Sequence, residues 1–348
     1  MPEAVQTPKR PLLPAALRWS GPLLSALYGL GVKFHRSSAR PQFAPVATIC
    51  IGNITVGGTG KTPATIFFAR ELASRGRKAA VLMRGYRQQG GDEAEEVKSA
   101  LRSFDVPVIL GGDRHASALD AAKRGCNVVL LDDGFQHWRL RRDLDIVLID
   151  GSDPFGGEKL VPHGFLREPL DGLARAGALL VTRSEHLSGE ERGALAERLK
   201  RYTQAPIFFA RHAPSGVRRL QALSGARDMT LADLRGLSAV GACGIGNPAA
   251  FWSTARDAGV ELVAREAFSD HHAYGVADVE RMVQLARAKN AQAILITEKD
   301  AVKIEKLELP ADAAFVSLRV EFQIDGFAHL WPAIEASLHA GDARHTIK

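Results

Sequence analysis

The segment 55–62, TVGGTGKT, has the residues of a loop that binds the phosphate groups of a nucleotide. In such a loop, glycines allow backbone N–H groups to surround phosphate oxygens, and the N-terminus of the next helix adds positive charge. The common pattern is G-x-x-x-x-G-K-[ST], with Thr55 here at the first glycine position. Lys61 would reach the β- and γ-phosphates, and the hydroxyl of Thr62 would bind Mg²⁺. The predicted nucleotide-binding residues are Gly57, Gly58, Thr59, Gly60, Lys61 and Thr62.

Carboxylates for the metal are expected at the end of a neighbouring apolar strand. The run VVLLDD supplies Asp132 and Asp133, and Asp150 follows the similar run DIVLI. Either member of the pair could instead cap the turn before Gly134, since aspartate often stabilises turns. We favour Asp132 and Asp133 as the metal ligands because further polar residues follow them in DDGFQH.

Phosphoryl transfer also needs a group that receives the proton of the attacking hydroxyl. Asp92, His137 and His271 are the candidates for this role. Asp92 precedes an acidic helix start, where aspartate is also a common helix cap. His271 belongs to the sequence DHH, in which Asp270 could orient it, although a surface turn explains the same residues. Spacing alone leaves these alternatives open.

The segments around these residues alternate between apolar runs and amphipathic stretches. Strands are expected at 46–53, 78–85, 106–112, 127–132, 144–150, 177–182 and 205–210, with helices between several of them. Continuous apolar strands that alternate with helices are typical of a parallel sheet covered on both faces. The sequence thus predicts a three-layer α/β/α fold like that of P-loop NTPases. The segment 55–62 lies between a predicted strand and a predicted helix. This position disfavours the alternative that 55–62 is a glycine-rich turn that binds no ligand.

A change of composition divides the chain further. Residues 212–236 have hairpin or linker character, and beyond them the alternation of strands and helices restarts. We therefore expect a P-loop kinase core at 46–211 and a second, smaller α/β domain at 237–348. The remaining segment, 1–45, differs from both.

The segment 1–45 is basic, with Glu3 as its only acidic residue, and contains the uncharged stretch WSGPLLSALYGLGV at 19–32. A membrane-spanning helix needs about 20 apolar residues, so this stretch is too short to span comfortably. We expect an amphipathic helix that lies in the membrane surface. A helix docked on the protein's own core is the alternative.

Composition limits the remaining choices. A formal net charge of +6 suits an anionic substrate, a nucleic acid or an anionic membrane surface. The three cysteines lack CxxC spacing, which disfavours a disulfide scaffold or structural zinc and favours a reducing compartment. A nucleic-acid-dependent ATPase would need a basic face with aromatic residues, whereas the basic excess lies in the N-terminal segment. We expect no nucleic-acid partner.

A regulatory P-loop GTPase or ATPase switch, or a metallochaperone, is the main alternative. Such a GTPase recognises guanine with N-K-x-D after a strand, and TEKD at 297–300 has a similar position. Its lysine stands one place too late and Thr297 replaces the asparagine, so a structural turn is favoured. The glycines of GACGIGNP at 241–248 lack the spacing of a dinucleotide-binding fingerprint.

Several further motifs accompany the phosphate loop. They are RGYR at 84–87, GDE at 91–93, GGDR at 111–114, LDDGFQH at 131–137, DPFG at 153–156, LREP at 166–169, GIGNP at 244–248, DHH at 270–272 and TEKDAVK at 297–303. With GNITVGGTGKTP at 52–63, this set resembles the tetraacyldisaccharide 4'-kinases, the lipid A 4'-kinases of Gram-negative bacteria. The motifs run in the family's order, and LDDGFQH and TEKDAVK are the most specific of them.

The resemblance implies an enzyme that uses ATP and Mg²⁺ to phosphorylate the 4'-hydroxyl of an acylated glucosamine disaccharide 1-phosphate. It implies that Asp92 is the general base, paired with His271, and that Asp132 and Asp133 act with Mg²⁺. Since Asp92 and His271 fall in different expected domains, closure around ATP would assemble the pair. The residues that the resemblance links to the acceptor or to catalysis are Tyr86, Glu93, Gln136, His137 and Arg167.

The resemblance also implies a location at the cytoplasmic face of the bacterial inner membrane, with attachment through the N-terminal segment. We infer no obligate protein partner. Two residues depart from the family's pattern, since Asp153 stands where arginine is common and His163 stands where alanine is common. Both departures lie in one stretch of the chain, after the strand expected at 144–150.

Overall fold

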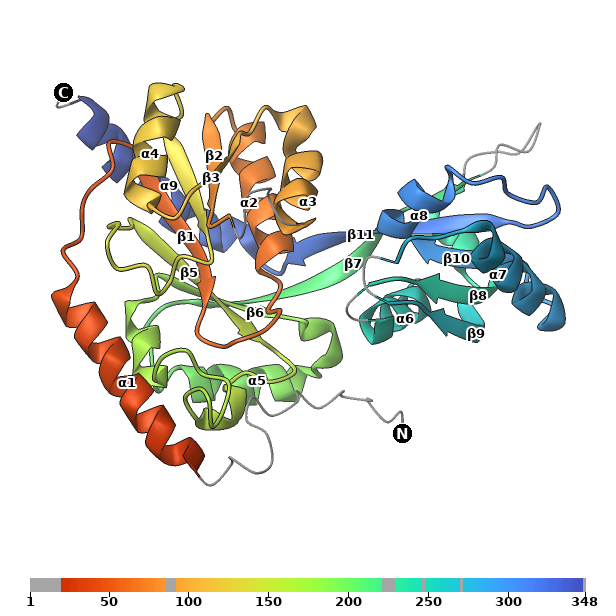
Figure 1. Ribbon diagram of the computed structural model, residues 1–348, viewed down its shortest axis with the longest axis horizontal. Helices are drawn as coiled ribbons and strands as arrows, with labels where there is room; N and C mark the ends of the chain where they lie inside the picture. Colours follow the sequence, from red (N-terminus) through yellow and green to blue (C-terminus); the bar gives the residue numbers. More distant parts are fainter. Residues whose placement is uncertain (1–19, 86–91, 221–228, 246–247, 270–271, 347–348) are drawn as a thin grey trace. The chain divides into compact units, whose positions relative to one another are not determined.

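The computed structural model describes residues 20–85, 92–220, 229–245, 248–269 and 272–346 (Figure 1). The chain forms two compact units. The first, which we call the phosphate-loop unit, comprises the described residues of Gln6–Arg211 and of Ile324–Lys348. The second unit comprises the described residues of His212–Gln323. Each unit has its own hydrophobic core.

The phosphate-loop unit is built on parallel strands in the order β3-β2-β4-β1-β5-β6-β7. The strands are β1 (Ala47–Asn53), β2 (Ala79–Met83), β3 (Val108–Leu110), β4 (Val128–Asp132), β5 (Leu144–Asp150), β6 (Ala178–Thr182) and β7 (Ile207–Arg219). Every residue of β1, β2, β4 and β6 is buried. Strands buried along their whole length need a covering layer on each face of the sheet.

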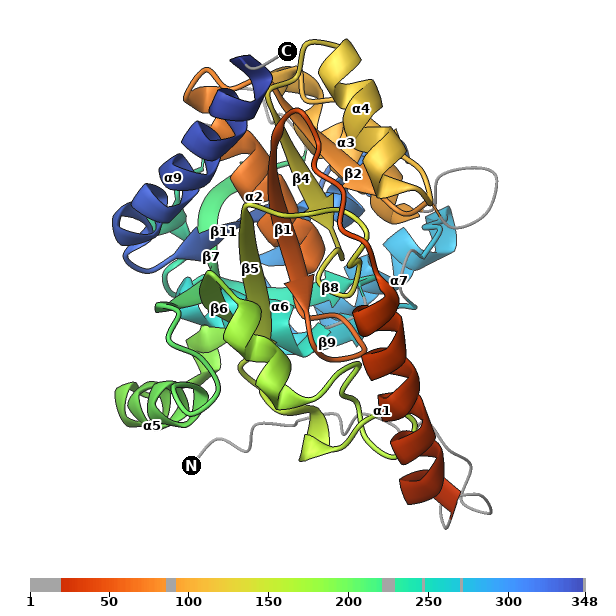
Figure 2. The ribbon, with the colours of Figure 1, turned by 90° about the vertical axis from the view of Figure 1, so that its left-hand side faces the viewer.

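Helices supply both of these layers. They are α2 (Lys61–Ser74), α3 (Asp92–Leu101), α4 (Arg114–Lys123), α5 (Gly189–Leu199) and α9 (Phe327–Thr346). The Phe67 ring of α2 and the Phe327 ring of α9 have centroids 5.1 Å apart, so these two helices share a layer. Right-handed crossovers place α4, which leads back from β3 to β4, on the face opposite to α2. Figure 2 shows α4 and α9 on opposite sides of the sheet, which confirms the predicted three-layer fold.

The second unit is a smaller α/β structure. Its further strands are β8 (Ser238–Cys243), β9 (Glu261–Ala267), β10 (Ala293–Thr297) and β11 (Phe315–Ile324), and its helices are α6 (Pro248–Asp257), α7 (Val276–Ala288) and α8 (Glu298–Ile304). The order is β7-β11-β10-β8-β9, with parallel pairing from β11 to β9. Alternate residues of β8 face two different cores. Ala239 packs with Trp252 of α6, and Val240 packs with Met282 of α7.

Two strands carry the chain between the units. Strand β7 enters the second unit at His212, and β11 leads back to the phosphate-loop unit. The two strands are antiparallel. Within the second unit Leu220 N–H donates to Phe315 O, and within the phosphate-loop unit Asp325 N–H donates to Phe209 O.

The region 212–236, predicted as a hairpin or linker, begins as a strand. Residues 212–219 continue β7 without a break. Strand β6 pairs with the start of β7, at 207–209. Pro214 therefore lies beyond the residues that pair with β6, on a stretch where the missing N–H of proline is tolerated.

The C-terminal helix belongs to a different unit from the one expected. The sequence placed it in a second domain at 237–348, whereas α9 belongs to the phosphate-loop unit. Leu330, Ile334 and Leu338 recur at helical spacing and are buried to 1% exposure or less. These residues make one face of α9 apolar. An apolar helix face does not specify which of two sheets it covers.

Helix α1 (Gly21–Ser38) packs its small residues against the protein. Gly21, Ser25 and Gly29 are buried on one face. The Ser25 hydroxyl donates to Leu160 O at 2.8 Å and accepts from His163 N–H at 3.1 Å. Small residues allow the helix backbone to approach the loop beneath it closely. This part of the predicted N-terminal segment is therefore helical and docked on its own unit.

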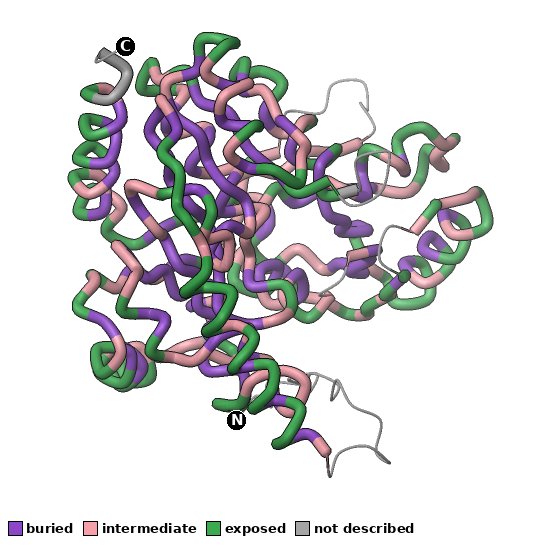
Figure 3. Tube along the Cα trace, turned by 60° about the vertical axis from the view of Figure 1, so that its left-hand side comes forward, coloured by how far each residue is buried: buried purple, intermediate pink, exposed green. Residues whose placement is uncertain are grey.

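The opposite face of α1 is apolar. Most of this helix is exposed (Figure 3). It carries Leu23, Leu27, Leu30 and Phe34, whose exposed fractions are 66%, 57%, 62% and 75%. Spacings of three and four residues place these side chains in one stripe, which we call the leucine stripe. Throughout the described ranges, no helix combines the length and apolarity needed to cross a membrane.

Candidate active site

The predicted phosphate loop links the end of β1 to the start of α2. Gly57 and Gly60 have φ values of 111° and 81°, in a left-handed region that glycine adopts without strain. Thr55, which replaces the first glycine of the common pattern, is buried and forms an antiparallel bridge with Leu166. Its φ is not positive. The position therefore accepts a side chain, which explains the departure from the pattern.

A segment around Arg167 runs beside the start of the phosphate loop. Val56 N–H donates to Phe165 O at 2.7 Å, and Arg167 N–H donates to Ile54 O at 2.7 Å. From α1, the hydroxyl of Tyr28 donates to Arg167 O at 3.0 Å. These bonds hold Arg167 next to the loop and connect α1 to the same place.

The start of α2 brings together three of the predicted site residues. Lys61 is the first residue of α2, and its Nζ lies 3.8 Å from Oδ1 of Asp133. Arg167 Nη1 donates to both carboxylate oxygens of Asp133, at 2.8 and 2.9 Å. Thr62, the predicted metal ligand, follows Lys61 in the first turn and is partly buried. A carboxylate thus lies between two cations at the helix end that would face the phosphates.

Asp132, the neighbour of Asp133, has a different environment. It is the last residue of β4 and is 7% exposed. Its Oδ1 accepts a hydrogen bond from the Thr65 hydroxyl of α2 at 2.9 Å. Burial raises the pKa of Asp132 to about 6, and the charge of Asp133 adds to the rise, while Thr65 and Lys61 oppose it. Asp150, the other strand-end candidate, pairs instead with Arg183.

Gln136 is held by a buried network that the sequence did not reveal. Its Nε2 donates to Asn53 O at the end of β1 and to Oε1 of Glu168, both at 2.8 Å. Arg175 Nη2 donates to Oε2 of Glu168 at 2.8 Å. Glu168 is 2% exposed, so its charge requires this partner. The motif LREP at 166–169 contained Glu168, but nothing in the motif indicated the partners.

His137 lies in a positively charged environment. Burial lowers the pKa of His137, and the nearby guanidinium groups of Arg114 and Arg142 lower it further. Its backbone oxygen accepts from Arg142 Nη1 at 2.7 Å. A neutral imidazole is therefore favoured at pH 7, and such a ring has one donor and one acceptor nitrogen.

The remaining predicted residues are only partly within the described structure. Glu93 is exposed on α3, and its charge contributes to the raised pKa of Asp132. Helix α3 begins at Asp92, whose side chain lies outside the described part. Tyr86 and His271 also lie outside the described residues.

The TEKD motif at 297–300 forms the start of α8. Thr297 Oγ1 accepts from Asp300 N–H at 3.1 Å and donates to Asp300 Oδ2 at 2.7 Å. The same carboxylate oxygen accepts from Gly244 N–H at 3.1 Å, and Asp300 is fully buried. The motif therefore joins the ends of β10 and β8. This geometry agrees with the structural turn that the sequence favoured.

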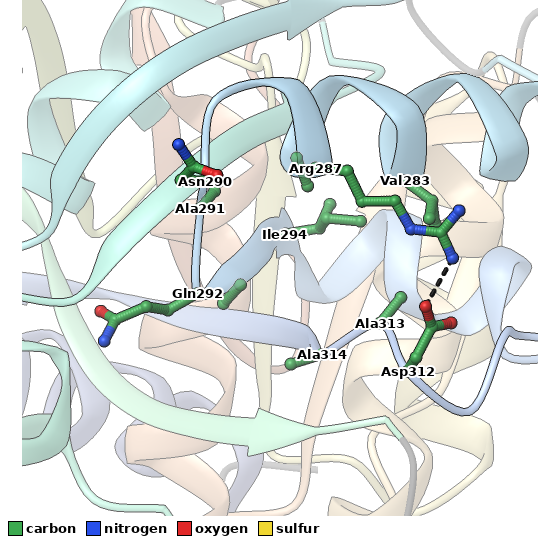
Figure 4. Close-up of a pocket in the computed structure, with 11 residues that line it drawn as sticks. Val283, Arg287, Asn290, Ala291, Gln292, Ile294, Asp312, Ala313 and Ala314 are labelled. Atoms are coloured by element: carbon green, nitrogen blue, oxygen red, sulfur yellow. Dashed lines mark hydrogen bonds and ion pairs between the residues drawn. The ribbon is translucent and has the colours of Figure 1, made fainter.

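A pocket of 410 Å³ in the second unit lies near the end of α7 and the start of β10 (Figure 4). Arg287 and Asp312 line it and form an ion pair. In open parallel sheets, ligands bind at the carboxyl ends of the strands. This pocket lies at the opposite end of β10, and its lining contains none of the predicted site residues. The site therefore remains the phosphate-loop end of the first unit.

The fold and site together define a class of protein. A glycine-rich loop joins a central parallel strand to a helix that begins with lysine and threonine. The neighbouring strand β4 ends at one aspartate and is followed by a second. This arrangement is that of P-loop proteins, which bind nucleotide phosphates at the loop and a metal ion beside it.

Comparison with known proteins identifies the family. The sequence matches the model of the tetraacyldisaccharide-1-P 4'-kinase family over residues 17–339. A tetraacyldisaccharide 4'-kinase of Syntrophus aciditrophicus is 37% identical over 342 residues, which cover 88% of this chain and 90% of that protein. One of Halothermothrix orenii is 35% identical over 318 residues, which cover 82% of each chain. The chain belongs to the tetraacyldisaccharide 4'-kinase family, which confirms the resemblance found in the motifs.

A solved structure shares the fold. It is the structure of LpxK from Aquifex aeolicus in complex with ATP, which is 24% identical and has a TM-score of 0.66. The match covers 92% of this chain and 99% of that chain. The family consists of ATP-dependent kinases of lipid A biosynthesis, and the assignment replaces the alternative of a regulatory GTPase or metallochaperone.

Proposed function

We propose that this chain transfers the γ-phosphate of ATP to the 4'-hydroxyl of a tetraacylated glucosamine disaccharide 1-phosphate. The observation that carries the proposal is the cluster at the start of α2, where Lys61 and Arg167 both pair with Asp133. Phosphoryl transfer depends on positioning and on positive charge around the moving phosphoryl group. Two cations beside a phosphate loop supply that charge.

The test is an incubation of the protein with ATP labelled on the γ-phosphate and the acceptor in detergent micelles. The proposal requires Mg²⁺-dependent movement of the label into the lipid. Label that appears only as inorganic phosphate would contradict it.

The proposed cofactor besides ATP is Mg²⁺, held by Thr62, Asp132 and Asp133. Proteins hold this ion with one or two carboxylates together with substrate phosphates and water. Asp132 suits the role because its carboxylate is buried and its Oδ1 is fixed by Thr65. Bound Mg²⁺ would neutralise charge on the β- and γ-phosphates.

Asp92 is proposed as the general base for the 4'-hydroxyl, with His271 as its partner. The support is the match of GDE at 91–93 and DHH at 270–272 to the family's motifs. A sugar hydroxyl is a weak nucleophile, and a carboxylate within about 3 Å can accept its proton as the O–P bond forms. His271 would orient that carboxylate or raise its basicity.

Tyr86, Glu93, Gln136, His137 and Arg167 are proposed to bind the acceptor or assist the reaction. Gln136 is supported by its two fixed hydrogen bonds, which orient its side chain before any ligand binds. His137 is supported by its lowered pKa, because a neutral ring can accept a hydrogen bond from a sugar hydroxyl. A lipid acceptor also requires that this site be accessible from a membrane surface.

We propose that α1 provides this access by attaching the protein to the cytoplasmic face of the bacterial inner membrane. The leucine stripe supports the proposal, since an apolar stripe on an exposed helix face can insert among lipid chains. Lys33 lies in the second half of the helix, Arg36 in its last turn and Arg40 just beyond it, where they would meet anionic headgroups. Tyr28 connects the same helix to Arg167. The proposed reaction needs no protein or nucleic-acid partner.

A further inference from the structure

Two side chains at the end of β6 hold the phosphate loop from outside. The hydroxyl of Thr182 donates to Thr59 O at 2.9 Å. Arg183 Nη2 donates to Gly58 O at 2.6 Å. The two bonds fix consecutive peptide groups in the middle of the loop.

These bonds determine where the loop's N–H groups point. A trans peptide is planar, and its C=O and N–H point in opposite directions. The bond from Arg183 to Gly58 O therefore directs Thr59 N–H away from β6. The bond from Thr182 to Thr59 O likewise directs Gly60 N–H away from β6. A phosphate loop binds its ligand through N–H groups that converge on one side.

Arg183 is itself fixed by a buried carboxylate. Its Nη1 donates to Asp150 Oδ2 at 2.7 Å, and Asp150 is 1% exposed. Oδ1 of Asp150 accepts from the backbone N–H of Ser152 at 3.0 Å and from its hydroxyl at 2.6 Å. The guanidinium is a rigid fork, so fixing one nitrogen fixes the direction of the others.

We propose that Arg183 is a positioning residue for nucleotide binding. Anchored by Asp150, it holds the Gly58–Thr59 peptide in the orientation that presents Thr59 N–H to the phosphates. The inference rests on the proposed use of ATP at this loop. It also gives Asp150 a role in place of the metal-binding role considered from the sequence.

The test measures the dissociation constants of ATP and ADP with the full chain by isothermal titration calorimetry. Arg183→Ala should weaken both by about 10-fold or more, the effect expected for loss of a charged hydrogen bond. Arg77→Ala is the matched control, because Arg77 is 26% exposed and pairs with Asp342 at 2.9 Å, while Arg183 is 25% exposed. The control should bind both nucleotides as the parent does.

A second variant separates nucleotide binding from folding. Arg183→Ala removes the guanidinium that pairs with the buried carboxylate of Asp150, which can destabilise the protein. The double variant Asp150→Asn with Arg183→Ala removes that charge, and its thermal denaturation reports folding. Unchanged ATP and ADP affinities in a folded double variant would overturn the proposal. So would a changed ratio of ATP to GTP affinity, because it would show that Arg183 reads the base.

Failure of the proposed function would look different from failure of this inference. In that case the parent chain would bind no ATP, or Lys61→Ala would bind it as the parent does. The inference fails if the parent binds ATP in a Lys61-dependent way and the Arg183 variants either bind ATP equally well or change the ratio of ATP to GTP affinity.

Discussion

Arg167 and Asp133 form an ion pair in which one guanidinium nitrogen, Nη1, lies 2.8 and 2.9 Å from the two carboxylate oxygens. Asp132, the preceding residue, makes its hydrogen bond to the Thr65 hydroxyl instead. Adjacent carboxylates therefore differ in their environments. Asp133 is paired with cations, whereas Asp132 is buried with a raised pKa. We infer that Asp133 and Arg167 act as one unit in the site.

A double-mutant cycle tests this coupling. Arg167→Ala and Asp133→Asn should each lower kcat/KM for phosphate transfer by about 10-fold or more. When two residues act as a unit, the losses in kcat/KM from the single substitutions do not add in free energy. The double variant should therefore be about as active as the less active of the two single variants. The measurement is steady-state kinetics with both substrates varied. Strictly multiplicative losses would show that the two residues act independently.

The proposed general base makes a separable kinetic prediction. Asp92→Asn should reduce kcat by about 100-fold or more, because proton removal from the hydroxyl would lose its acceptor. Its affinity for ATP should be unchanged, which calorimetry can check. His271→Ala should lower kcat to a smaller extent. If His271→Ala kept full turnover while Asp92→Asn abolished it, the proposed pairing would be wrong.

The leucine stripe predicts a specific effect on membrane binding. Leu27→Glu should reduce the fraction of protein that sediments with anionic vesicles by about 10-fold, since it removes an exposed apolar side chain that would insert among the lipid chains and adds a negative charge that the vesicles repel. Ala194→Glu adds the same charge at an exposed position of α5 and should sediment like the parent. Equal sedimentation of the parent, Leu27→Glu and Ala194→Glu would exclude the stripe as the attachment surface.

His137 predicts a pH dependence of stability. Burial, Arg114 and Arg142 lower its pKa in the folded state, and Asp113 opposes them. The folded chain therefore binds fewer protons at this site than the unfolded chain, whose histidine titrates near pH 6.5, at about its ordinary value. The stability that His137 contributes to the folded chain is present above that pH. It is lost as the pH falls through the window between the pKa of the unfolded chain and the lower pKa of the folded chain.

The measurement for His137 is the midpoint of thermal unfolding at a series of pH values from about 7 to 5. His137→Gln should lose stability less steeply on acidification than the parent. A substitution of His339, which is exposed on α9, serves as the control and should keep the slope of the parent. Identical slopes for the parent and His137→Gln would contradict the assigned environment of His137.

Much of the fold followed from local patterns in the sequence. The continuous apolar runs at 46–53 and 127–132 form β1 and β4, because strands buried on both faces need no polar alternation. The phosphate loop could be recognised because its glycines meet a local requirement, the left-handed backbone conformation of Gly57 and Gly60. The path of β7 through Pro214 could not, since local composition favours a turn while the strand is stabilised by pairing with the distant β11.

The candidate site likewise contains some residues that local sequence predicts and others that it does not. The places of Lys61 and Thr62 at the start of α2, and of Asp132 and Asp133 at the end of β4, could be predicted because each lies next to a recognisable element. Their roles stay predictions. Glu168 and Arg183 could not be predicted, because their partners come from other loops. Gln136 is 32 residues from Glu168 in the sequence, and Gly58 is 125 residues from Arg183. Such pairings exist only after the sheet has brought the strand ends together.

Transfer to the 4'-hydroxyl is tested most directly by comparing two acceptors. The parent chain is given ATP labelled on the γ-phosphate with either the tetraacylated disaccharide 1-phosphate or its 4'-deoxy analogue, in Mg²⁺ and detergent. We predict labelled lipid with the first acceptor and none with the analogue, and no labelled lipid with Lys61→Ala. Equal labelling of both acceptors, or ATP hydrolysis without labelled lipid, would contradict the proposed reaction.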